Sequence, residues 1–141
     1  SVFAAEPIIL NESNPVLDLT GKTIEGPIIV ESGNVIITGN GTVTSPVYPA
    51  DYAGTYVSQY YCTMFFTCGN LVINGGTFKC ATPKWTLNAH DKTQSIIEVK
   101  GGTFVNYNPA EVYTEPTQPK NFVAEGYKSV EKDGEFTVVA E

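Results

Sequence analysis

Arginine is absent from this chain of 141 residues, and its eight lysines face fifteen aspartates and glutamates, for a formal net charge of −7. Proteins that bind nucleic acids or anionic membranes need a basic surface, and they commonly use the planar guanidinium group of arginine to hold phosphate. We therefore expect neither nucleic acid nor an anionic membrane among the partners. We interpret the acidic balance as a contribution to solubility.

Long apolar runs are also missing from the sequence. No stretch of ~18 apolar residues occurs, so no membrane insertion is predicted. Residues 1–6 lack the basic start and the apolar core of a secretory signal peptide. Two explanations stay open at this end: a leader was removed, or an initiator methionine was lost before Ser1.

Cysteine is scarce, with Cys62, Cys68 and Cys80 as the three examples. An odd number argues against a complete disulfide framework, and the spacing toward His90 does not match that of a zinc site. We expect buried thiols in a β core, with no metal and no cofactor. One bridge, Cys62–Cys68 or Cys68–Cys80, stays open for an exported protein.

What the sequence does contain is an internal repeat. Residues 27–38 align with residues 63–74, so that apolar residues match and two Gly-Asn pairs coincide. Related segments occur at 96–104 and, more weakly, at 16–24. Each copy has an alternating strand, a glycine corner, and a strand of threonine followed by an apolar residue. Because alternate side chains of a strand share one face, we predict a common set of inward-facing positions. These are Leu17, Leu19, Ile24, Val35, Ile37, Val43, Leu71, Ile73, Phe78, Ile97, Val99 and Phe104.

Such a unit buries its inner face only when it is stacked on neighbours. We therefore predict an all-β fold, a short right-handed parallel β-helix (β-solenoid) with a C-terminal β-hairpin cap, in which Phe78 stacks on Phe104. An antiparallel sandwich is the alternative. The offsets between copies, about 18, 36 and 26 residues, are irregular because loops of different length leave the coils. The longest offset is either two plain coils or one coil with a tyrosine-rich insertion near 45–62, and the composition favours the insertion.

The two ends are predicted to differ. Residues 1–107 form the β-helix, and residues 108–141 form a proline-rich connection followed by the cap. In that cap, strands at 127–131 and 135–139 flank a Lys-Asp-Gly turn at 132–134. At the other end, residues 7–10 are expected to cover the first coil.

Catalytic patterns are weak. The cluster His90-Asp91-Lys92 falls in a polar stretch, 86–93, that we interpret as an exposed loop between coils. A polysaccharide lyase needs a base and cations around an acidic sugar, and a glycosidase needs two neighbouring carboxyl groups. Stacking is able to pair carboxylates such as those of Glu31 and Glu98, but outward glutamates on strands are normally solvated. We predict no enzyme activity and no catalytic residues.

Aromatic residues form the strongest candidate contact surface. Four tyrosines recur every four residues in the insertion, and two further rings accompany them. They either cover the side of the β-helix or contact a neighbouring subunit or a sugar, with subunit contact favoured over glycan. The candidates are Tyr48, Tyr52, Tyr56, Tyr60, Tyr61 and Trp85.

Several segments together resemble a known group of proteins. The run at 17–24, the Gly-Gly-Thr-Phe units and the segment 121–128 resemble pectate-lyase-like β-helix proteins of gut bacteria and their phages. Residues 101–104, Asn108-Pro109-Ala110 and the tail 122–127 are similar to phage head-fibre proteins. The resemblance covers residues 17–141.

That resemblance implies a non-enzymatic, capsid-decorating fibre on the virion surface. Such a protein is commonly a homotrimer, contacts capsid or other virion proteins, and acts in display or in adhesion to host or mucosal surfaces. No catalytic residues are carried over. The alternatives are a polysaccharide-cleaving or glycan-binding β-helix of the tailspike kind, and an exported bacterial adhesin at the cell surface.

Overall fold

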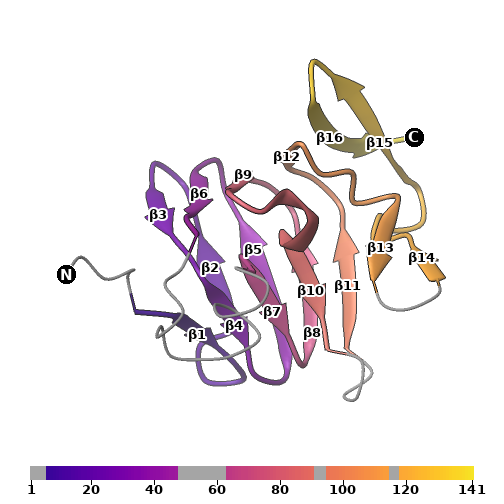
Figure 1. The fold of residues 1–141 in the computed structure, drawn as a ribbon. Coiled ribbons are helices and arrows are strands. Elements are labelled where there is room, and N and C mark those ends of the chain that lie inside the picture. The colour runs from indigo at the N-terminus through magenta and orange to yellow at the C-terminus, as the bar shows by residue number, and fades with distance from the viewer. Residues whose placement is uncertain (1–5, 48–62, 91–94, 115–117) are drawn as a thin grey trace.

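The computed structural model describes residues 6–47, 63–90, 95–114 and 118–141, and it is an all-β structure with parallel sheets (Figure 1). No helix among these residues is long and apolar enough to cross a bilayer.

Twelve strands make up three parallel arrays. The first sheet contains β1 (Ile8–Leu10), β4 (Ile28–Val30), β7 (Phe65–Thr67) and β10 (Leu87–Ala89). The second contains β2 (Val16–Asp18), β5 (Asn34–Thr38), β8 (Asn70–Ile73) and β11 (Ile96–Val99). The third contains β3 (Thr23–Glu25), β6 (Thr42–Ser45), β9 (Thr77–Cys80) and β12 (Thr103–Val105).

The order of the strands along the chain explains this arrangement. The chain visits the first, second and third sheets in turn and then returns to the first, next to the strand it left there. We call each set of three successive strands a pass; β1 to β3 form the first pass and β10 to β12 the fourth. Every neighbouring pair within the three arrays is parallel.

The register of the strands confirms the predicted columns. Val35 pairs with Leu71, and Leu71 pairs with Ile97, all on parallel strands of the second sheet. The alternative of an antiparallel sandwich is therefore wrong for this part of the chain. The outer face of the third sheet carries a second column, of threonines. Its members are Thr23, Thr42, Thr77, Thr103 and Thr137.

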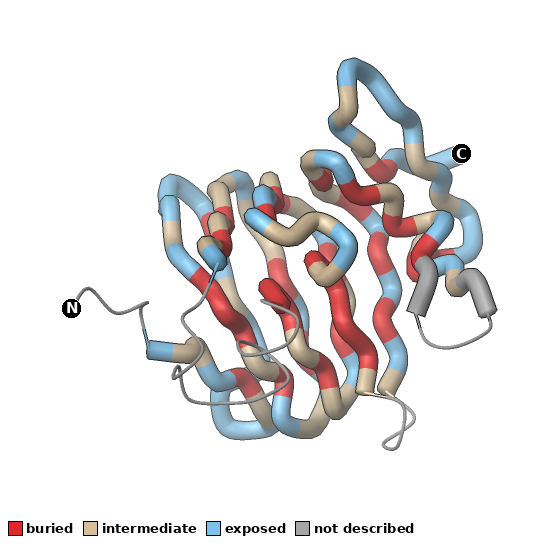
Figure 2. Tube along the Cα trace, in the orientation of Figure 1, coloured by how far each residue is buried: buried red, intermediate tan, exposed pale blue. Residues whose placement is uncertain are grey.

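The core lies between the three sheets, and Figure 2 shows buried residues alternating along the strands. Ten of the twelve predicted inward positions are fully buried, whereas Leu17 and Ile24 of the first pass are half-buried. Phe78 stacks on Phe104 as predicted, with ring centroids 4.9 Å apart and an interplanar angle of 25°. Phe65 and Phe78 form an edge-to-face pair with ring centroids 5.5 Å apart. Such aromatic pairs add about 0.5–1.5 kcal/mol beyond the burial of their area.

Two details of the predicted stacking are corrected or settled by the register. Leu17 lies beside Ile37, two residues further along than the sequence alignment placed it. Because side chains alternate with a period of two, an even shift leaves the inward face unchanged. The longest offset is one pass, since β5 pairs directly with β8. The insertion itself falls largely outside the described residues.

The glycine corners are required by close backbone approach. A Cβ atom on Gly101 would collide with the carbonyl oxygen of Asn74 in the preceding pass. The following residue, Gly102, has φ 95°, a conformation that residues with a side chain rarely adopt. The Gly-Gly pair thus lets one pass lie directly on the next.

The C-terminal hairpin is confirmed, whereas the proposed N-terminal cover is not. Strands β15 (Tyr127–Lys132) and β16 (Glu135–Ala140) pair antiparallel, and β16 also pairs antiparallel with β12. The turn has positive φ at Asp133 and Gly134, as expected of a tight hairpin turn. Residues Ile8–Leu10, expected to cover the first coil, instead form β1 within the first sheet. A separate short antiparallel pair joins β13 (Val112–Thr114) to β14 (Gln118–Lys120).

Candidate functional site

Only one of the predicted contact residues lies in the described part of the chain. Tyr48, Tyr52, Tyr56, Tyr60 and Tyr61 fall within 48–62, outside the described residues. Their proposed face therefore stays a prediction. Trp85, by contrast, is described, and its surroundings contain a candidate site.

Trp85 lies at the end of a short 3₁₀ turn, η2 (Pro83–Trp85), between β9 and β10. Proline fits the start of such a turn because its φ is already restricted. The Thr86 hydroxyl donates to the carbonyl oxygen of Pro83 at 2.7 Å and holds the turn closed. Lys84 Nζ lies 5.5 Å from the centroid of the half-buried indole ring, within the range of a cation–π contact.

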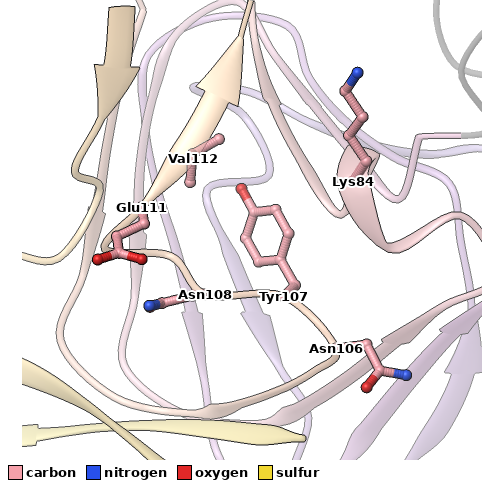
Figure 3. Close-up of a pocket in the computed structure, with 6 residues that line it drawn as sticks. All are labelled: Lys84, Asn106, Tyr107, Asn108, Glu111 and Val112. Carbon is pink, nitrogen blue, oxygen red and sulfur yellow. The ribbon is translucent and has the colours of Figure 1, made fainter.

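A pocket of about 400 Å³ opens next to this turn (Figure 3). It forms where η2 approaches the segment that follows β12. Its lining residues are Lys84, Asn106, Tyr107, Asn108, Glu111 and Val112.

The segment after β12 is shaped by two asparagines. Asn106 adopts φ 55°, and its backbone N–H donates to the carbonyl oxygen of Gly134 at 2.7 Å. Asparagine tolerates this left-handed conformation better than most residues. The side-chain oxygen of Asn108 accepts from the backbone N–H of Ala110 at 3.0 Å, which closes a local turn. The two turns place Glu111 at one side of the pocket (Figure 3).

Tyr107 forms the buried part of the lining. Its ring packs 6.0 Å from that of Phe104, and its hydroxyl donates to the carbonyl oxygen of Leu87 at 3.5 Å. Burial raises the pKa of the Tyr107 hydroxyl well above its ordinary value of 10. The hydroxyl therefore stays protonated near neutral pH and is a hydrogen-bond donor, not a base.

The chemistry of this lining suits a neutral or mixed-charge polar ligand. One ammonium group, one carboxylate and two amides supply donors and acceptors, and the Trp85 ring lies next to Lys84. Among the residues that the structure describes, no group of three or more His, Cys, Asp and Glu side chains is placed to hold a metal ion. The sequence pointed only to Trp85, which neighbours the pocket through Lys84 and is not one of its lining residues. The lining residues come together only when η2 meets the segment after β12.

The candidate cluster around His90 looks different in the structure. The stretch 86–93 was expected to be an exposed loop, but Leu87–Ala89 is the buried strand β10. This stretch pairs with β7, and its polar residue Asn88 is buried beside Thr63, whose hydroxyl accepts from the Asn88 side chain at 3.4 Å. His90 meets Phe66 edge-on at 5.5 Å. Asp91 and Lys92 lie outside the described residues.

The cysteines are only in part what the sequence predicted. Cys80 is buried in the core, as expected, but Cys68 is half-buried. Cys68 is a free thiol, so a Cys68–Cys80 bridge is not formed; Cys62 lies outside the described residues. Burial, with a smaller effect of the Glu31 charge, raises the pKa of the Cys68 thiol. A protonated thiol of this kind is a poor nucleophile.

Comparison of the chain with models of protein families, with curated proteins and with solved structures gave no match.

Proposed function

We propose that the three sheets are the faces of a right-handed parallel β-helix and that the chain is a non-enzymatic virion surface protein. In this role it decorates a capsid as a head fibre and acts in display or in adhesion to host or mucosal surfaces. One observation carries the proposal: four passes stack in register and end in an antiparallel hairpin. Stacked passes form a rigid support, and the hairpin pairs with the last strand edge of the third sheet.

The outer face of the second sheet supports assembly into a homotrimer. Three apolar side chains on this face are well exposed: Val16 at 50%, Ile36 at 38% and Ile96 at 56%. Val16 and Ile36 are neighbours in the register, and Val72 continues their column. This apolar column ends at Glu98 in the fourth pass, and Ile96 lies beside Asn70 in the neighbouring column. Exposed apolar side chains of this kind are stabilised when a second subunit covers them. Analytical ultracentrifugation tests this directly; a monomer at micromolar concentration would remove the trimer.

The virion assignment is tested on particles. An antibody raised against the purified chain should label the capsid surface of virions in immunoelectron microscopy, and mass spectrometry of those virions should detect its peptides. Labelling of bacterial cells with no labelled virions would instead favour the exported adhesin.

A second candidate function, glycan binding, is favoured by the pocket beside Trp85. Amide and carboxylate side chains suit sugar hydroxyls, and the half-buried Trp85 ring, which lies next to Lys84, suits the apolar face of a sugar ring. A glycan array should then give a signal that Trp85→Ala and Asn108→Ala each weaken. Release of reducing or unsaturated ends from acidic glycans would point further, to a polysaccharide-cleaving protein.

A further inference from the structure

The two ends of the stack are closed to different degrees. At the fourth pass, β10 is the last strand of its sheet, and the described segment 122–124 pairs with the end of β11, at Val99. The Val99 N–H donates to the carbonyl oxygen of Phe122 at 2.7 Å, and the Ala124 N–H donates to that of Val99 at 3.0 Å. Strand β16 covers β12, and Tyr107 and Val112 are buried over the core. At the first pass, β1, β2 and β3 are each the last strand of their sheet, and no described strand pairs with their outer edges.

The hydrogen bonds of the first pass show which backbone groups point to this open edge. Pro15 and Leu19 flank β2 on either side. The Pro15 carbonyl oxygen accepts from the Ile36 N–H of β5 at 2.8 Å, and the Leu19 N–H donates to the Thr38 carbonyl oxygen of β5 at 2.7 Å. Alternate residues of a parallel strand direct their backbone groups to opposite sides. The N–H and C=O groups of Val16 and Asp18 therefore point away from the stack. The same alternation holds in β3. The Lys22 carbonyl oxygen accepts from the backbone N–H of Thr42, so the N–H and C=O groups of the next residue, Thr23, point outward.

The described residues also leave the core incompletely covered at this edge. Leu17 and Ile24 point inward from β2 and β3 but are only half-buried, whereas their neighbours Ile37 and Val43 in the next pass are fully buried. An extended segment placed along β2 would cover Leu17 with every second side chain. The side chains between them would point outward, beside Asp18.

The charge around the open edge is one-sided. Residues 6–25 contain four exposed carboxylates and one lysine, Lys22. The carboxylates belong to Glu6, Glu12, Asp18 and Glu25. Hydrogen bonds from the Ser32 and Thr20 hydroxyls lower the pKa of Glu12 and of Asp18, so both groups are ionised near neutral pH. A second copy docking through its own open edge would bring like charges together, which disfavours that arrangement.

We infer that the open edge of the first pass binds an extended segment of a partner protein in which apolar residues alternate with lysine or arginine. The segment adds a strand to β2, its apolar side chains cover Leu17, and its cations lie against Asp18 and Glu25. This inference deepens the proposed function, because it makes the first pass the attachment end and the hairpin the displayed end.

The test uses the full chain and a short synthetic peptide in which lysine alternates with valine. Amide resonances of β2 and β3 should shift on titration, those of β15 should not, and added salt should weaken the affinity. The variant Asp18→Asn/Glu25→Gln should bind the peptide about tenfold more weakly. The matched control, Glu125→Gln/Glu141→Gln, removes two exposed carboxylates near the hairpin and should change the affinity less than about twofold.

No binding at millimolar peptide would overturn the inference, and so would shifts confined to β15 or equal binding of a glutamate–valine peptide. Concentration-dependent self-association with shifts at β2 and β3 would do the same, in favour of a second copy. Melting temperatures of both double variants report whether each variant is folded. If a variant is unfolded, the salt dependence of peptide binding by the unaltered chain still tests the inference. Virion labelling without peptide binding would remove the inference and leave the proposed function. Peptide binding without virion labelling would leave the binding edge and remove the virion assignment.

Discussion

The first and the last pass of the stack have the same architecture but meet different surroundings. At the last pass, Phe104 is fully buried beneath the hairpin and Tyr107. At the first pass, the equivalent position in the third sheet is Ile24, which is half-buried. The repeat therefore sets which side chains point inward, whereas the neighbours of each pass set how much those side chains contribute to stability.

Core truncation should give the largest difference between the two ends. Phe104→Ala removes a fully buried ring that stacks on Phe78, and it should lower the free energy of unfolding by about 3–5 kcal/mol. Leu17→Ala at the open end should cost about 1–2 kcal/mol, since that side chain is half-buried. Urea denaturation measures both values. Equal costs would mean that the open end is covered in solution.

Corner glycines should give the next largest effect. Gly101→Ala places a methyl group against the Asn74 carbonyl and should destabilise the protein by about 2–3 kcal/mol. Gly21→Ala, at the corner of the first pass, meets no atom within 4 Å, although its φ of 70° is unfavourable for alanine. It should cost only about 1 kcal/mol. Thermal unfolding of the pair decides the point, and the reverse ranking would contradict the stacking of the passes.

A smaller effect is expected along the threonine column. The hydroxyl oxygens of Thr103 and Thr137 are 3.0 Å apart and join the last pass to the hairpin. Thr103→Val should lose about 0.5–1.5 kcal/mol because this hydrogen bond disappears. Thr23→Val, exposed at the open edge, should change stability by less than about 0.5 kcal/mol. Chemical denaturation of both variants and of the unaltered chain measures the free energy of unfolding. Equal losses for the two variants would contradict the prediction.

The smallest expected effect concerns acid stability at the open end. Hydrogen bonds from the Thr20 hydroxyl and backbone N–H lower the pKa of Asp18 below its ordinary value of 3.8. A carboxyl group with a lowered pKa in the folded state stabilises the fold above its unfolded pKa, and this contribution is lost as the pH falls through the folded value. Asp18→Asn should therefore reduce the loss of stability below about pH 4. An NMR titration giving Asp18 a pKa at or above 3.8 would contradict it.

Much of the fold was predictable because the repeat depends on interactions between residues that are close in sequence. Alternating apolar residues around Val35 and Leu71, glycine corners and the turn at Asp133 depend mainly on neighbours in sequence. The stretch around Leu87 was misassigned because its short strand carries Asn88, and a buried asparagine looks like a loop residue until its partner is known. The pocket beside Trp85 had no signal in the sequence for the same reason, since its lining comes from segments twenty or so residues apart.

The β character, the inward positions, the stack of Phe78 on Phe104 and the hairpin could all be predicted from the amino-acid sequence. The folded structure was needed to establish the register of the first pass, the place of Ile8–Leu10 in a sheet, and the different cover of the two ends. The physical reason is that alternation and turn chemistry act between adjacent residues. Strand pairing and burial, by contrast, depend on which distant segment arrives alongside.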